Sequence, residues 1–137
     1  MTEASQAPII EWSERYAVGI RVIDGQHREM LDLVNRLLEG LSSGREPAEL
    51  TESLRELVRC TEHNIATEER LMGEFGLEAA HHRDEHRRLL ESVRNFHIRL
   101  EPRAVAESSR FLRQWLLGHI EEDDRPFAAL LRSRGAT

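Results

Sequence analysis

Apolar residues recur every three or four positions over most of this 137-residue chain, in four stretches that glycine or proline separates. This spacing places the apolar side chains on one face of a helix, so each stretch predicts an amphipathic helix. Four such helices with short links predict an all-α fold, an up-down-up-down four-helix bundle. The stripes contain, in chain order, Met30, Leu31, Val34, Leu37, Leu38 and Leu41; Leu50, Leu54, Leu57, Val58, Ile65, Leu71 and Met72; Leu89, Val93, Phe96 and Leu100; and Val105, Phe111, Leu112, Trp115, Leu116 and Ile120.

Capping and helix-breaking residues indicate where the first two helices begin and end. Asp24 is expected to cap the start of the first helix by accepting from its first amides. Gly40 and the Ser-Ser-Gly that follows soon after it should end that helix. Pro47 suits the first turn of the second helix, and the Gly-Glu-Phe-Gly turn at 73–76 should end it.

The rest of the chain completes one domain with a short arm. The third helix is expected over about residues 79–100, and Pro102 should close it or open the fourth. Residues 1–11 lack periodicity and are expected to form a flexible N-terminal arm, which leaves 12–137 as the bundle.

Composition excludes several classes of function. A net charge of -6 argues against a nucleic-acid partner, because a phosphate-binding surface needs an excess of basic residues. Apolar runs fall short of the roughly 18 residues that a membrane span needs, and the first residues do not resemble a signal peptide, so we expect no membrane association. The single cysteine, Cys60, is expected to be a small residue on a helix face and fits a reducing compartment. These features favour the cytoplasm.

Five ionisable groups interrupt the apolar stripes, and they come from all four predicted helices. Each would need its own hydrogen-bond partner in a leucine-rich interior, whereas a metal site would satisfy all of them together. A bundle builds a two-metal carboxylate site in this way. By contrast, His97 stands alone on its stripe and is expected to be an ordinary core histidine. The five groups are His27, Glu68, His82, His86 and His119.

Imidazoles mixed with carboxylates suit iron, zinc or manganese, and their number favours two ions over one. A sixth group should come from the acidic residues after His119. Asp124 is five residues away, which is about 140° around a regular helix, so spacing alone favours Asp123. However, Pro126 could break the helix locally and turn Asp124 inward. Both aspartates therefore remain candidates.

These residues resemble the hemerythrins, particularly the bacterial single-domain type. The resemblance covers nearly the whole chain from Trp12 onward and rests on four segments taken together. These are GIRVIDGQH ending at His27, EERLM beginning at Glu68, HRDEH from His82 to His86, and WLLGHIEEDD ending at Asp124.

The resemblance implies a non-heme di-iron centre that binds dioxygen. It favours Asp124 over Asp123, and it implies that Glu68 and Asp124 bridge the two irons. It implies three histidines on one iron and a single histidine on the other; these are His82, His86 and His119 for the first, and His27 for the second.

One position departs from the family pattern. The family has a histidine four residues before the bridging glutamate, where this chain has Asn64, followed by Ile65 in place of an aromatic residue. Asn64 is thus a weak ligand or pocket residue, and Ile65 and Trp115 are expected to line the pocket. His63 could replace the lost ligand only if its helix widened into a π-bulge; otherwise it should be solvated, as should His81.

Three functions remain open on the sequence. The chain could be a binding protein that holds dioxygen, or another small ligand, for storage, delivery or sensing. The resemblance favours this function over an enzyme. An iron with open positions could instead activate oxygen, as in an oxidase-type di-iron enzyme. The bundle could also be a metal-depleted structural remnant. The sequence does not identify a protein partner.

Overall fold

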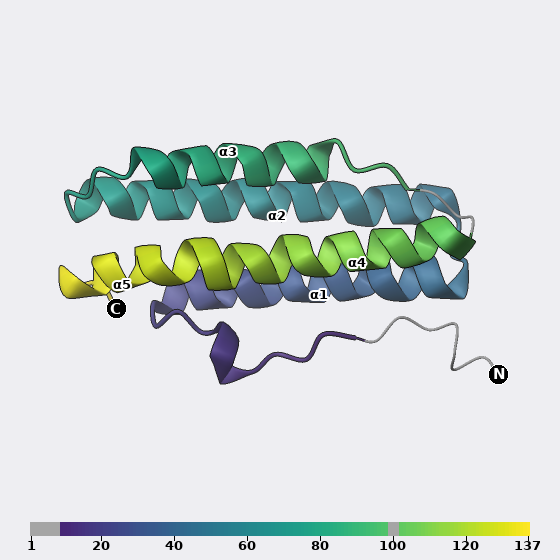
Figure 1. Ribbon diagram of the computed structural model, residues 1–137, viewed down its shortest axis with the longest axis horizontal. Helices are drawn as coiled ribbons and strands as arrows, with labels where there is room; N and C mark the ends of the chain where they lie inside the picture. Colours follow the sequence, from purple (N-terminus) through teal and green to yellow (C-terminus); the bar gives the residue numbers. More distant parts are fainter. Residues whose placement is uncertain (1–8, 99–101) are drawn as a thin grey trace.

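The computed structural model describes residues 9–98 and 102–137, which form an antiparallel bundle (Figure 1). Helix α1 contacts α2 and α4, and α2 contacts α3. The described residues are helical or irregular and contain no strand, which confirms the predicted up-down-up-down bundle. Its elements are α1 (Arg21–Ser43), α2 (Pro47–Glu74), α3 (Ala80–Arg94), α4 (Pro102–Gly118), η3 (His119–Asp124) and α5 (Arg125–Ser133).

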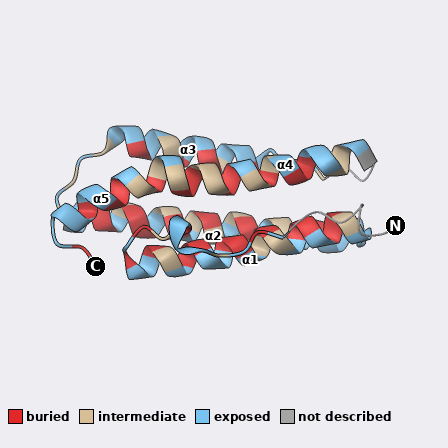
Figure 2. Ribbon diagram, turned by 60° about the horizontal axis from the view of Figure 1, so that its bottom comes forward, coloured by how far each residue is buried: buried red, intermediate tan, exposed pale blue. Residues whose placement is uncertain are grey.

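The apolar stripes form one buried core between the helices. Buried residues lie on the inner faces of the helices and exposed residues on their outer faces (Figure 2). Burying these side chains supplies the main stabilisation, at about 25 cal/mol per Å² of apolar surface removed from water. Each helix contributes to this core. Its completely buried members include Ile23, Met30, Leu37, Leu57, Met72, Leu112, Leu116 and Ile120. The candidate metal groups therefore sit within an otherwise apolar interior.

Helix α1 differs from the prediction at its start and at Gly40. It begins at Arg21, and the carboxylate of Asp24 accepts from the amides of Val18 and Gly19, which lie before the helix. Asp24 therefore fixes the entering loop instead of capping the first turn. The helix continues through Gly40 and ends in the predicted Ser-Ser-Gly, where Gly44 has a left-handed φ of 73°.

Gly40 has a packing role in place of the predicted break. A Cβ built at this position would lie 2.6 Å from a methyl group of Leu50 on α2. Glycine therefore permits the close approach of α1 and α2 near the turn that joins them. A helix interior tolerates one glycine when tertiary packing offsets its lower propensity.

The chain before α1 packs along the bundle. A short 3₁₀ turn, η2 (Glu14–Tyr16), is capped by Ser13, and Tyr16 is buried. Most of the expected arm, residues 1–8, lies outside the described residues. Ile10, near its end, is buried, and its backbone exchanges two hydrogen bonds with the side chain of Asn35. The packed region therefore begins before residue 12.

Helix α3 is shorter than predicted. It ends at Arg94, so the helical spacing does not continue through the residues that follow. Phe96 is only partly buried and stacks on Phe111 with a ring separation of 5.1 Å. His97 is exposed, so its expected place in the core is wrong. Pro102 begins α4.

The structure also bears on the predictions of no membrane span and of an ordinary cysteine on a helix face. Among the described residues, every helix is too short or too polar to cross a membrane. Cys60 is partly buried beside Glu29, and burial together with that carboxylate raises the pKa of its thiol to about 11. Because the thiolate is the reactive form, Cys60 is unreactive near neutral pH.

Candidate metal centre

Six buried side chains meet near one end of the bundle, with two carboxylates at the centre and four imidazoles around them. Glu68 Oε1 lies 2.9 Å from Nε2 of both His82 and His86. Asp124 Oδ2 lies 2.7 Å from Nε2 of His27 and 2.8 Å from Nε2 of His119. All six side chains are at most 5% exposed; they are His27, Glu68, His82, His86, His119 and Asp124.

Both carboxylates belong to each of two possible ligand groups. In each group, one ligand atom per residue lies within 4.8 Å of all the others. One group adds His27 and His119 to the carboxylates, and the other adds His82 and His86. This is the arrangement that two ions sharing Glu68 and Asp124 would require. His119 stands with His27 in this grouping, whereas the resemblance implies that it shares an iron with His82 and His86.

A π-helical turn brings His119 and Asp124 together. Residues 119–124 form η3, in which backbone bonds span five residues, so side chains five apart come onto one face. The expected break at Pro126 does not occur, because Arg125 keeps helical angles and the proline lies in the first turn of α5. Asp124 is buried at the centre, while Asp123 lies outside His119, 3.6 Å from its Nδ1.

Three of the four imidazoles have a carboxylate near their outer nitrogen, Nδ1, which faces away from the centre. His82 Nδ1 lies 2.8 Å from Glu85, and His86 Nδ1 lies 3.0 Å from Glu69. These two carboxylates orient the rings of His82 and His86 so that Nε2 faces the centre. Asp123 lies 3.6 Å from His119 Nδ1, which is beyond hydrogen-bond distance.

Sequence analysis did not identify Glu69 and Glu85 as part of the site. Glu85 follows His82 by three residues, a helical spacing that could have indicated the pair. Glu69 pairs with His86 across two helices, and no local spacing reveals that contact.

Several buried polar atoms of this cluster have no hydrogen-bond partner among the described residues. Such groups are costly unless something else satisfies them. His119 Nε2 is one of them although Asp124 lies 2.8 Å away, because the two atoms are not aligned for a hydrogen bond. Metal ions among the carboxylates would satisfy the unpartnered carboxylate oxygens and His119 Nε2, so the residues fit a metal pair. The unpartnered atoms include Glu68 Oε2, Asp124 Oδ1, His119 Nε2, His27 Nδ1 and Asn64 Oδ1.

The charged side chains of the cluster shift one another's pKa values. Burial alone would lower the pKa of His82, but Asp124 and Glu68 outweigh it and raise that pKa to about 10. Burial likewise opposes the charged forms of His27 and His119, yet the same carboxylates raise both pKa values. Burial would raise the pKa of Asp124, but His119, His27 and His82 hold it well below its usual range. Without metal, protonated imidazoles therefore balance the two carboxylates.

We expect the metal-free protein to lose stability as pH rises from about 6.5 toward 10. A raised folded-state pKa stabilises fully below the unfolded value of 6.5, and for His82 this contribution is lost as pH passes about 10. The metal-loaded protein should instead lose metal as pH falls below about 6, since protons compete for the imidazoles. Melting temperatures of both forms between pH 5 and 10 test this, and a flat profile for the metal-free form would contradict it.

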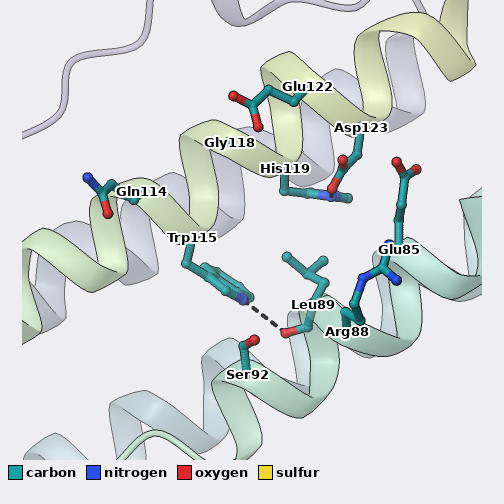
Figure 3. A pocket seen from close by; sticks show the side chains of 10 residues that line it. All are labelled: Glu85, Arg88, Leu89, Ser92, Gln114, Trp115, Gly118, His119, Glu122 and Asp123. Atoms are coloured by element: carbon teal, nitrogen blue, oxygen red, sulfur yellow. Dashed lines mark hydrogen bonds and ion pairs between the residues drawn. The ribbon is translucent and has the colours of Figure 1, made fainter.

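A pocket of about 260 Å³ lies between α3 and α4 on the outer side of His119 (Figure 3). Glu85, Glu122 and Asp123 give it an acidic wall. Trp115 lines the same pocket, and its indole nitrogen donates to the carbonyl of Leu89 at 2.9 Å. Trp115 therefore separates this polar pocket from the core.

The remaining candidates lie on or near α2. Asn64 is completely buried on the face that carries Glu68, and Ile65 is partly buried against the core. Helix α2 is α-helical throughout, so the widening that would bring His63 inward is absent, and His63 is exposed. His81 is also exposed, and its Nε2 lies 3.1 Å from Glu85.

Comparison with known proteins identifies the family. The family model described as "Hemerythrin HHE cation binding domain" matches residues 18–131, which includes the whole cluster. The chain belongs to the hemerythrin family. This confirms the resemblance seen in the sequence, and the family binds non-heme iron.

Relatives of this hemerythrin are named bacteriohemerythrin. Those of Pseudomonas paraeruginosa and Stenotrophomonas maltophilia are each 31% identical to it, over 124 and 123 residues, covering 88% of this chain and 80% of each relative. The bacteriohemerythrin of Methylococcus capsulatus is 26% identical over 129 residues, covering 90% of this chain and 97% of its own length. The similarity thus extends over most of both chains.

Proposed function

We propose that this hemerythrin holds two iron ions between its four helices and binds dioxygen reversibly, for storage, delivery or sensing. The observation that carries the proposal is the pair of buried carboxylates, Glu68 and Asp124, each shared by both ligand groups. When bound, a pair of ferrous ions would supply the electrons with which dioxygen is taken up.

The side chains of this protein would hold the irons and keep the centre dry. Glu68 and Asp124 provide two negative charges, and the four histidines provide neutral nitrogen donors when deprotonated. Glu85 and Glu69 would keep the outer nitrogens of His82 and His86 protonated, which fixes the tautomer that presents Nε2 to the metal. The apolar core around the cluster limits entry of water and protons, which would otherwise promote oxidation of the irons.

One observation favours a second function, an oxygen-activating enzyme. Asn64 occupies the position where the family pattern has a histidine, and an amide is a weaker donor than an imidazole toward iron. An iron with fewer strong ligands has a position for a second small molecule. We rank this below reversible binding, because the six other positions of the family pattern are filled.

The absorption spectrum of the protein, reconstituted with Fe²⁺ without oxygen, tests the function. Exposure to air should produce a new visible band, and removal of the gas should abolish it over several cycles. A Glu68→Gln variant is the control, because it removes one shared negative charge at similar size. Continuous consumption of oxygen and an added reductant would instead indicate the enzyme, and an unchanged spectrum would refute both.

The single cysteine supports a reducing compartment, so we place the protein in the cytoplasm.

A further inference from the structure

Three buried side chains form a hydrogen-bonded row beside the metal cluster. The amide nitrogen of Gln26 donates to the hydroxyl of Thr67 at 2.8 Å. The amide nitrogen of Asn64 donates to the carbonyl oxygen of Gln26 at 2.9 Å. Gln26 and Thr67 are each 6% exposed and Asn64 is completely buried, so water does not compete for these bonds.

This row determines which end of the Asn64 amide is free. Its nitrogen is directed to Gln26, which leaves Oδ1 as a buried oxygen without a partner. The reversed arrangement would leave the amide nitrogen of Asn64 unpaired instead, beside a site that binds cations. A carbonyl oxygen is the end that positive charge favours, so the arrangement seen is the one a metal-loaded centre would stabilise.

The free oxygen belongs to the His27 side of the cluster. Asn64 precedes Glu68 by four residues, one turn on the same face of α2. Its partner Gln26 adjoins His27 on α1. An asparagine is shorter than a histidine, so its oxygen stops short of the point that an imidazole nitrogen would reach. We infer that this difference in length leaves room for a small ligand between Asn64 and the metal.

We propose that Gln26 and Thr67 fix Asn64 as a hydrogen-bond acceptor for a small ligand that carries a proton, such as water, hydroxide or hydrogen peroxide. This inference rests on the proposed metal pair and goes beyond it. An oxygen that only accepts hydrogen bonds favours ligands with an N–H or O–H group over ligands without one. Asn64 thus selects among ligands, and Gln26 is a positioning residue for it.

Azide and cyanamide are suitable probes, because both are linear and similar in size but only cyanamide carries N–H groups. Their dissociation constants can be measured from the absorption spectrum of the oxidised di-iron protein. Asn64→Leu removes the acceptor at similar volume and should weaken cyanamide binding by about fivefold to tenfold, the worth of one hydrogen bond. Azide affinity should stay the same or rise.

Gln26 variants separate positioning from simple packing. Gln26→Met releases the amide of Asn64 and should move the ratio of the two dissociation constants toward that of Asn64→Leu. Gln26→Glu still accepts from Asn64 and should keep the wild-type affinity for neutral cyanamide; azide is not compared for this variant, because the added negative charge would repel an anion. Iron content is measured for every variant, so that ligand effects are compared at equal metal.

Three results would overturn the inference. Equal losses for both probes would indicate general disruption, and no change would show that Asn64 does not face the ligand. A loss for azide alone would show that the N–H end of Asn64 faces the centre. Iron content near zero in the wild-type protein would refute the proposed function itself, whereas full iron with an unchanged ratio would refute only the role of Asn64.

Discussion

Replacement of His82 by alanine is expected to release at least one of the two proposed metal ions and to destabilise the fold. His82 Nε2 lies 2.9 Å from Glu68 and 3.2 Å from Asp124, so this one ring contacts both central carboxylates. Its ring also stacks on Phe127 with a centroid separation of 3.9 Å. The variant would remove an ion-pair partner from both buried carboxylates and leave a cavity beside them.

We expect the free energy of unfolding to fall by roughly 3–5 kcal/mol, the usual cost of removing one partner from a buried charge pair. Chemical unfolding followed by circular dichroism measures the loss, and elemental analysis gives the metal. His81→Ala is the matched control, because His81 is the adjacent residue but exposed, and it should change stability by at most about 0.5 kcal/mol. Full metal content and an unchanged unfolding curve for His82→Ala would make His82 an ordinary core residue.

Replacement of Asn64 by histidine is expected to lengthen the life of the oxygenated form. An imidazole supplies a stronger donor than an amide oxygen while leaving the charge of the site unchanged. Its Nδ1–H could donate to the oxygen of Gln26, as the amide of Asn64 does now. The iron on the His27 side would then exchange ligands less readily.

The rate of oxidation in air should fall about tenfold in Asn64→His, measured as decay of the oxygenated absorption band. Asn95→His, which adds an imidazole at an exposed position after α3, is the control and should oxidise at the wild-type rate. If Asn64→His leaves both the spectrum and the oxidation rate unchanged, Asn64 does not face the metals.

The fold and the core of the site could be predicted from sequence because both depend on helical spacing. Glu68, His82 and His86 fall on apolar stripes of regular helices, where a polar residue is conspicuous. Spacing could not place Asp124, because the π-helical turn at 119–124 changes the number of residues per turn. Only the family resemblance favoured it over Asp123.

Contacts between helices account for most of what sequence missed. Gly40 resembles a helix breaker, but the proximity of Leu50 that gives it a packing role exists only in the assembled bundle. The hydrogen bond between Gln26 and Asn64 joins residues 38 positions apart, and neither residue type predicts it. His97 followed the stripe of α3, yet the helix ends before reaching it.

The most direct test of the di-iron centre is the iron content of protein reconstituted with Fe²⁺ without oxygen and freed of excess metal. Because Glu68 and Asp124 are each shared by two ligand groups, we predict two irons per chain. A reproducible value near one would contradict the paired centre.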